Sequence, residues 1–563
     1  MAARNVWTPD EPRELALSAS QVGTFTALPT LGGNAFTEKP PLAYWLSGAA
    51  MDVFGVSGAA ARAPSLVYAF IAIVAIFQLG RRMGTRATGT LAALIFATSW
   101  LVFNTQIWLA CDALLLAAVS LSILGIYMAV GPQREFLAGC VWMHAGLLLA
   151  LFTKSFAGWV VPVTTLCTYL LLQRRLRELL HPGFWLPLLG SVALLFLWAD
   201  DVAHGSDGGG NLRALFWDNL VGRFASYSDP SDAVRALGHP NWPGKYLVEL
   251  PVYLLPWTPL LFGAIVCLWR KRELRAPMTV PVRFALCACV PALCILSIAS
   301  TSRGIYAAPL IPGFALLIAT VMTELEPGPS LQGVLRGAFR WTVWVMMLTD
   351  GVIIAAIAVL DAAHGRGGRA GLVASLVGMA ILVAICLRLL RDDSFSAGRS
   401  EAIEGPVVRL AGAHAAALVT IAVALFPVLN RSQDLARIAA VLEESSAGRP
   451  LVLWLPDETT LAMSDLYMRK PVCSILFDHG TEADRARQLG NCLQRFPRAA
   501  VVAVEACPKD ECGDAFKLAL RKDPMQRRRL AFHDATLLAA GVNPVDGIVR
   551  LGGRAYVLGY HAL

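Results

Sequence analysis

Apolar runs long enough to cross a bilayer recur from about residue 60 to residue 428, and short charged or Gly/Pro-rich joints separate them. A helix needs about 20 apolar residues to span the ~30 Å of hydrocarbon in a membrane. The chain is 56% hydrophobic and only 16% charged, which is more apolar than a soluble core requires. The sequence therefore predicts an α-helical polytopic membrane protein. We expect about twelve helices, at roughly 62–80, 87–103, 112–130, 137–152, 155–173, 184–200, 246–269, 282–300, 304–324, 340–360, 371–391 and 406–428.

The basic joints predict the orientation of these helices. Lys and Arg near helix ends favour the cytoplasmic side, and alternate joints carry them, at 81–86, 173–180, 270–277 and 388–393. The N-terminal segment and the tail then lie together on the outer face. The net charge of +8 is mainly a signal of this topology. No basic stripe with interleaved aromatics is visible, so we expect no nucleic-acid partner.

The N-terminal segment, residues 1–61, precedes the first expected span. Its opening, "MAARNVWTPDEPRELALSAS", has neither a signal peptide nor a membrane span. Either an earlier helix is missing or the following helix pulls these residues across, and we favour a missing helix. We expect a periplasmic N-terminal loop with amphipathic helices, followed by a transmembrane bundle over 62–428.

The tail, residues 434–563, changes to short apolar stretches that are typical of buried strands. The expected strands cover 450–455, 472–477, 499–506 and 554–560, with an amphipathic helix at 481–496. This pattern predicts a small C-terminal periplasmic α/β domain.

Four of the twelve cysteines fall in this tail, namely Cys473, Cys492, Cys507 and Cys512. In an oxidising compartment they suggest two disulfides, and "CPKDEC" offers a local loop. Free buried thiols are the alternative. A zinc site is disfavoured because no paired CxxC or HxxxH spacing accompanies them.

Charged residues gather in the outer segments and at the outer ends of spans, where function is expected. Taken singly, Asp112 reads as a helix cap, Asp10 and Glu11 as solvated loop acids, and Lys39 as a snorkelling side chain. The wider set also includes Arg13, Glu38, Tyr44, Lys154 and Arg303.

Together these residues indicate one site, because acids and cations from distant segments fall on one face of one bundle. Pro40-Pro41 stiffens the backbone behind Glu38 and Lys39. The cations could neutralise a phosphate at the membrane surface, and Asp10 with Asp112 could hold a divalent metal or orient a nucleophile. The combination predicts an enzyme that acts on a lipid-linked phosphate.

Motifs in order over residues 5–320 support this interpretation. "WTPDEPRELALSAS", "FTEKPPLAYW", "CDALLLAA", "FTKSFAGWVVP", "GRFASYSD" and "SRGIYAAPLIPGFALL" resemble, in that order, the bacterial GT-C glycosyltransferases of the aminoarabinose transferase and protein O-mannosyltransferase superfamily. The tail resembles, more weakly, the periplasmic domain of the aminoarabinose transferases. Their lipid A transferases have about thirteen helices, which supports the idea of a missing first helix.

The resemblance implies transfer of a sugar from undecaprenyl phosphate to lipid A or another envelope acceptor at the periplasmic face of the bacterial inner membrane. By motif, Asp10 and Asp112, with Glu11 beside them, are the catalytic acids. The implied substrate-binding residues are Arg13, Glu38, Lys39, Tyr44, Lys154, Arg223, His239, Arg303 and Tyr306. Arg303 replaces a frequent lysine, and Glu14 replaces an aromatic of the aminoarabinose enzymes, so the sugar is open.

Other functions remain as alternatives. One is glycosylation of a protein hydroxyl in the manner of a protein O-mannosyltransferase. A transporter of lipid-linked sugar is less favoured, because transporters place ionisable residues at the midplane of repeated halves, and no repeat is visible. A non-catalytic assembly or sensor protein would leave the bundle poor in polar residues. We expect a monomer.

Overall fold

The computed structural model describes residues 4–8, 10–205, 208–221, 242, 244–273, 278–299, 303–324, 329–364, 368–391, 400–432, 434–476, 482–505, 537, 539–551 and 554–561. Four residues singled out from the sequence lie outside the described residues: Arg223, His239, Cys507 and Cys512.

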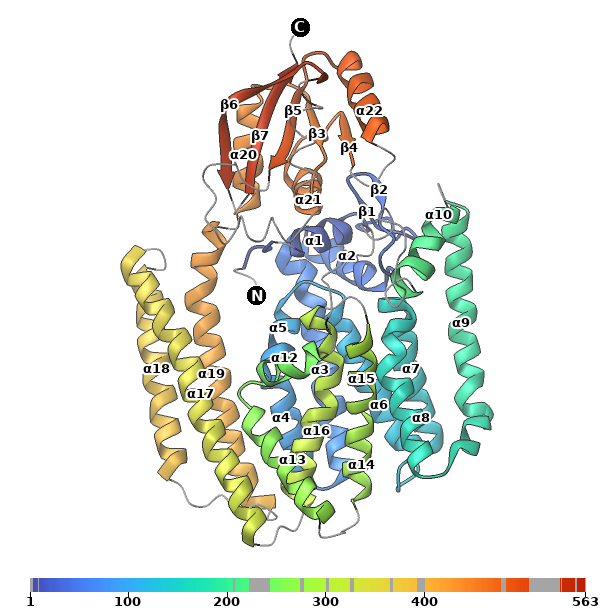
Figure 1. The fold of residues 1–563 in the computed structure, drawn as a ribbon, viewed down its shortest axis with the longest axis vertical. Helices are drawn as coiled ribbons and strands as arrows, with labels where there is room; N and C mark the ends of the chain where they lie inside the picture. The colour runs from blue at the N-terminus through green and yellow to red at the C-terminus, as the bar shows by residue number, and fades with distance from the viewer. Residues whose placement is uncertain are drawn as a thin grey trace.

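A helical bundle forms most of the molecule (Figure 1). Its helices are α3 (Gly58–Met83), α4 (Arg86–Thr98), α5 (Trp100–Ile107), α6 (Asp112–Val130), α7 (Phe136–Lys154), α8 (Val160–Leu172), α9 (Pro182–Ala203), α10 (Gly208–Arg213), α12 (Lys245–Tyr253), α13 (Thr258–Glu273), α14 (Val280–Cys287), α15 (Val290–Ile298), α16 (Ile311–Glu324), α17 (Pro329–His364), α18 (Gly368–Arg391) and α19 (Ser400–Ser432). Short helical turns join some of them: η1 (Ser155–Trp159), η2 (Leu176–Leu180), η3 (Ala214–Val221) and η4 (Gly304–Leu310). The predicted multi-pass membrane fold is confirmed.

The number of spans differs from the expected count of about twelve. Within the described residues, nine helices are long and apolar enough to cross a membrane, or up to eleven if each bent pair is one span. One of the nine, Phe136–Leu172, contains a reversal of the chain at η1. Arg175, just after α8, donates to the carbonyl of Val130, which ends α6 ahead of α7, at 2.8 Å. The helices α7 and α8 therefore run antiparallel. Counting them as two spans raises the upper count from eleven to the expected twelve.

Close packing of α6 and α7 fixes the part of the bundle that carries the site. A Cβ added at Gly125 would lie 2.2 Å from the backbone nitrogen of Met143, and one added at Gly146 would lie 2.3 Å from Ser122 Oγ. Only glycine lets the two backbones approach this closely, as is common between membrane helices. The ends of α6 and α7 that carry Asp112 and Lys154 are held side by side as a result.

An N-terminal platform lies across one end of the bundle, beneath the C-terminal domain (Figure 1). It consists of α1 (Glu11–Ala19), β1 (Thr30–Leu31), β2 (Asn34–Ala35) and α2 (Leu42–Phe54). Pro41 is the N-cap of α2, where a fixed φ and a missing N–H cost nothing. The two prolines thus end the loop that carries Glu38 and Lys39.

The C-terminal domain has a five-stranded sheet in the order β4-β3-β5-β7-β6. Its elements are α20 (Leu435–Ser445), β3 (Leu451–Trp454), α21 (Glu458–Tyr467), β4 (Cys473–Ile475), α22 (Glu482–Arg495), β5 (Ala500–Glu505), β6 (Val542–Leu551) and β7 (Arg554–His561). The strand β3 is parallel to β4 and β5, whereas β7 is antiparallel to β5 and β6. The four predicted strands and the predicted helix at 481–496 are present. The strand β6 was not predicted, because the Pro, Asp and Gly in "VNPVDGIVRL" interrupt its apolar pattern.

One disulfide, Cys473–Cys492, joins β4 to α22. It accounts for two of the four cysteines that were expected to pair.

One hydrophobic core joins the platform to the C-terminal domain. Buried residues of α1 and α2 pack in the same cluster as residues of α20, α21, β3 and β5; they include Leu15, Leu17, Tyr44, Leu435, Leu451, Met463 and Val502. A polar contact adds to this packing, because the backbone N–H of Gly32 donates to Asp465 Oδ2 at 2.6 Å. The two ends of the chain are therefore packed against each other above the bundle.

Candidate functional site

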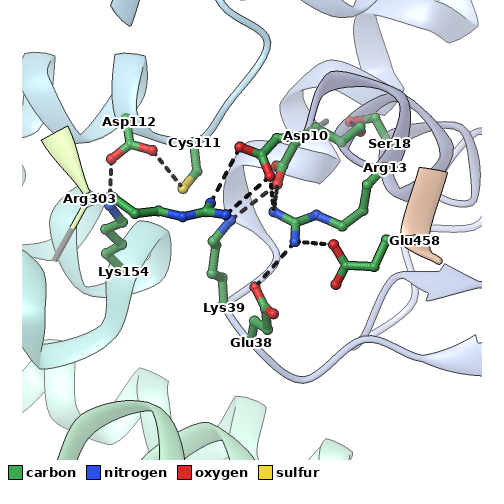
Figure 2. Close-up of polar contacts among 11 residues, drawn as sticks. Asp10, Arg13, Ser18, Glu38, Lys39, Cys111, Asp112, Lys154, Arg303 and Glu458 are labelled. Atoms are coloured by element: carbon green, nitrogen blue, oxygen red, sulfur yellow. Dashed lines mark hydrogen bonds and ion pairs between the residues drawn. The ribbon is translucent and has the colours of Figure 1, made fainter. Parts of the chain in front are cut away.

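Charged residues from the platform, the bundle and the C-terminal domain meet where these three parts join (Figure 2). Ion pairs link seven of them into what we call the Arg13 network: Asp10, Arg13, Glu14, Glu38, Lys39, Arg303 and Glu458. Asp112 and Lys154 form a further pair beside it. Apart from Glu11, Tyr44, Arg223 and His239, the residues singled out from the sequence are thus brought together, with Tyr306 beneath Lys154.

Arg13, in the first turn of α1, is the centre of this network. Its side chain is only 4% exposed. Nη1 donates to Glu458 at 2.7 Å and lies 3.7 Å from Glu38, while Nη2 donates to Glu14 at 2.9 Å. Burial alone would lower the pKa of Arg13, but the surrounding carboxylates raise it well above its ordinary value. Arg13 is therefore a permanent cation.

Lys39 shares Glu14 with Arg13. Its Nζ donates to Glu14 Oε1 at 3.1 Å, and Glu14 is 2% exposed. Burial by itself would raise the pKa of Glu14, yet Lys39 and Arg13 together hold that pKa at about 2. Burial would lower the pKa of Lys39, and Glu14 raises it above its ordinary value. Both charges are therefore present at neutral pH.

Asp10 stands directly before α1 and faces Arg303, which precedes η4. The two guanidinium nitrogens donate to the two carboxylate oxygens at 3.3 and 3.4 Å. Asp10 is the N-cap residue of α1, but its side chain makes no capping bond. With a quarter of its side chain exposed, Asp10 is open to a ligand.

Asp112 is the first residue of α6 and is buried. Its carboxylate accepts a hydrogen bond from Lys154, whose Nζ lies 4.4 Å from the centre of the Tyr306 ring. The thiol of Cys111 is 3.9 Å from the other carboxylate oxygen. Asp112 makes no capping bond, since Cys111 is the N-cap residue and it lacks a side-chain cap. The pairing with a cation therefore replaces the capping role that Asp112 alone suggested.

The prediction that Glu11 acts with the catalytic acids does not fit its place in the structure. Its side chain is fully buried and pairs with Arg4 and Arg62. It also accepts hydrogen bonds from the backbone N–H groups of Trp7 at 2.8 Å and Leu109 at 2.7 Å. With its oxygens occupied and shielded, Glu11 anchors the platform to α3 and to the loop before α6.

Tyr44 was expected among the substrate-binding residues, where an aromatic ring could stack on a sugar. The structure corrects this: its side chain is buried in the core that joins platform and C-terminal domain, with its ring edge-on to Phe36 at 6.2 Å. Its hydroxyl has no hydrogen-bond partner among the described residues. A buried ring cannot stack on a sugar.

Two members of the network were missed from the sequence. Glu14 had been noted only as a departure from an aromatic. Glu458 lies in the first turn of α21, whose N-cap Asp457 accepts from Thr460 N at 2.8 Å. The helix start in "PDETT" is readable in the sequence, but nothing there relates it to Arg13.

A divalent metal held by Asp10 and Asp112 was also considered. Within the part of the chain that the structure describes, no group of three or more His, Cys, Asp or Glu side chains could hold an ion. Each of the two aspartates faces a cation instead. The donor set among the described residues does not fit a metal.

Comparisons with known proteins find similarity to membrane glycosyltransferases. Residues 38–199 match the family model of dolichyl-phosphate-mannose-protein mannosyltransferases. The undecaprenyl phosphate-alpha-4-amino-4-deoxy-L-arabinose arabinosyl transferase of Pseudomonas aeruginosa (strain UCBPP-PA14) is 30% identical over 332 residues, or 58% of this chain. The match spans 57% of that relative's own length. The transferase of the same name from Aeromonas salmonicida (strain A449) is 27% identical over 403 residues, covering 68% of this chain and 69% of the relative.

The fold is also shared with a solved structure. ArnT from Cupriavidus metallidurans, in its crystal structure bound to undecaprenyl phosphate, superposes with a TM-score of 0.64. The superposition covers 99% of this chain and 94% of that one, at 17% sequence identity. At that identity the likeness is one of fold.

Proposed function

We propose, on the premise that this chain is related in sequence and fold to the GT-C membrane glycosyltransferases, that it transfers a sugar from a polyprenyl phosphate to an acceptor at the outer face of the membrane. The observation that carries the proposal is the site itself. A partly exposed carboxylate, Asp10, lies between the buried cation Arg13 and the more exposed Arg303 at the end of a membrane bundle. The Cupriavidus relative, which has this fold, was solved with undecaprenyl phosphate, and that lipid is the carrier we propose here.

In the proposed reaction a bond forms between an acceptor oxygen and the anomeric carbon, and the bond from that carbon to the phosphate oxygen breaks. The phosphate leaves with a growing negative charge. Arg13 and Lys39 from the platform and Lys154 from α7 would stabilise that charge, because cations in a site shielded from water act on it more strongly than they would in water. We also propose, from the motif resemblance, that Arg223 and His239 bind the substrate.

The role of Asp10 and Asp112 depends on the acceptor. A lipid A phosphate is anionic at neutral pH, so the carboxylates would only orient it. A hydroxyl acceptor must lose its proton, and Asp10, the more exposed of the two, would take it as general base.

The names of the relatives support an amino sugar such as aminoarabinose as the sugar. Lipid A as the acceptor is proposed from the motif resemblance. The second candidate is transfer to a protein hydroxyl, which the name of the matching family model supports. In either case we propose a monomer in the bacterial inner membrane, with the C-terminal domain in the periplasm.

Mass spectrometry of lipid A from cells with and without the gene tests the first candidate. We expect loss of an amino-sugar mass from a lipid A phosphate when the gene is absent. Unchanged lipid A would contradict this acceptor. Glycoproteins would then be compared between the two strains.

A second test addresses the site rather than the acceptor. Undecaprenyl phosphate should raise the thermal unfolding midpoint of the purified protein, because a ligand that binds only the folded state stabilises it. No shift at saturating lipid would contradict the proposed carrier.

A further inference from the structure

Glu458 brings the C-terminal domain into the site. Among the residues that the structure describes, it is the one member of the Arg13 network that comes from the C-terminal domain. Its Oε2 accepts from Arg13 Nη1 at 2.7 Å, the shortest contact of that arginine. Figure 2 shows its carboxylate reaching Arg13 alongside that of Glu38.

Contacts between α21 and the platform hold the backbone of Glu458 in place. One turn further along α21, Leu461 lies against Gly32 of the platform, and Asp465 accepts from the N–H of the same glycine. The side chain itself is 49% exposed. The carboxylate can therefore turn away into solvent while α21 stays in place.

The charge balance of the network opposes an incoming anion. Among the described residues it contains four carboxylates and three cations, so it carries one net negative charge. A phosphate would be repelled unless a carboxylate left first, since like charges a few ångströms apart in a partly buried site repel strongly.

The carboxylates differ in how easily they can leave. Glu14 is buried and bound by both Arg13 and Lys39. Asp10 is held by both nitrogens of Arg303. Glu38 is 40% exposed but lies 3.7 Å from Arg13 Nη1, outside hydrogen-bond distance. Among these four carboxylates of the described network, Glu458 alone is both exposed and hydrogen-bonded to Arg13 Nη1.

We propose that Glu458 is a further residue of the donor site, which occupies Arg13 Nη1 while no lipid phosphate is bound and competes with that phosphate for it. The inference rests on the proposed function of this site as a lipid-phosphate site. When the lipid phosphate departs after transfer, the carboxylate returns to Arg13 and favours its release. The C-terminal domain thereby sets the affinity for the carrier lipid.

The test measures the Kd of undecaprenyl phosphate for the full chain in detergent, with wild type, Glu458→Gln and Glu443→Gln. Glu443 pairs with Arg469 within the same domain, outside the Arg13 network, and serves as the matched control. The amide at 458 removes the competing charge but keeps the size of the side chain. We expect Glu458→Gln to bind the lipid several-fold more tightly and Glu443→Gln to bind it as wild type does.

The direction of the change separates competition from a structural role, because damage to the site would weaken binding. If wild type binds the lipid and Glu458→Gln binds it equally or less well, Glu458 does not compete, and the proposed function stands. If neither protein binds it, both proposals fail. Should Glu458→Gln not fold, Glu458→Asp replaces it: its shorter side chain reaches Arg13 less well, and its Kd should also fall, by a smaller factor.

Discussion

At the scale of single residues, the site is a set of ion pairs rather than of free charges. Arg13, Lys39 and Lys154 each contact a carboxylate. Removing one partner of a buried pair leaves the other charge uncompensated, which costs about 3–5 kcal/mol. A substitution of a buried charge should therefore lower the stability of the protein, whereas a substitution of an exposed one should affect mainly its activity.

Asp10 and Glu11 are adjacent in sequence and should respond in opposite ways. We expect Asp10→Asn to abolish sugar transfer while membrane abundance and the thermal midpoint stay near those of wild type, because Asp10 is partly exposed. Glu11→Gln leaves Arg4 and Arg62 buried without their counter-charge, and should destabilise the protein by about 3–5 kcal/mol. Transfer assays and thermal unfolding in detergent check both. Normal transfer by purified Asp10→Asn protein would refute its assignment.

Glu14 should give the protein an acid-sensitive stability. Its pKa of about 2 lies below the ordinary value of 4.5, so its charge stabilises the folded state above pH 4.5, and this contribution is lost as the pH falls from 4.5 towards 2. The pKa difference corresponds to on the order of 3 kcal/mol. We expect Glu14→Gln to lower the thermal midpoint at pH 7 and to approach wild type at pH 3. Midpoints that differ by the same amount at both pH values would contradict this.

The sequence predicted most of the site and missed two of its features for physical reasons. The motif resemblance placed Asp10, Lys39 and Arg303 in one site, and the structure joins them in one network of ion pairs. It did not separate Asp10 from Glu11, because residues one step apart on a helix point about 100° apart and the local sequence does not show which side faces inward. Glu458 was out of reach, since its contact depends on how a distant domain docks.

At the scale of elements, the close approach of α6 and α7 decides where Asp112 meets Lys154. Apolar length and the positions of the basic joints were enough to predict both helices. The sequence did not show how closely they pack, because a glycine inside a helix can also be tolerated without any role in packing. The backbone distances at Gly125 and Gly146 identify a packing role.

Gly125→Ala tests this role. Helix propensity alone would make alanine more stable by about 1 kcal/mol, whereas overpacking costs about 1–3 kcal/mol, and the new Cβ would lie 2.2 Å from Met143 N. We expect the cost of overpacking to exceed the gain in helix propensity, so that the thermal midpoint falls. Gly190→Ala on α9 is the control, since nothing lies within 4 Å of its Cβ, and it should be neutral or stabilising. Equal effects of the two substitutions would argue against a packing role.

At the scale of the whole molecule, the platform and the C-terminal domain form one packed body at the end of the bundle, although about 400 residues separate α1 from α20. The apolar residues of α1 and α2 pack in that core with Ala60 and Ala61 of α3 and with Leu109, as well as with the C-terminal domain. The same packing positions the carboxylate of Glu458 beside Arg13. The platform therefore depends on the far end of the chain for its shape.

A chain that ends at residue 433 should expose the platform. We expect α1 and α2 to become accessible to a protease, while the fragments of the membrane bundle stay intact. Limited proteolysis followed by mass spectrometry of the fragments gives the sites of cleavage in the shortened and full chains. A platform protected equally in both would show that the shared core contributes little to its stability.

The shared core also sets an order on biosynthesis. At ~5–20 residues per second on the ribosome, α20 is made roughly 20 to 80 seconds after α1, and β7 later still. During that interval the platform lacks the C-terminal part of its core. The bundle helices of a nascent chain are thus all translated before Glu458 can complete the Arg13 network, so the segment after α19 decides when that network is first complete.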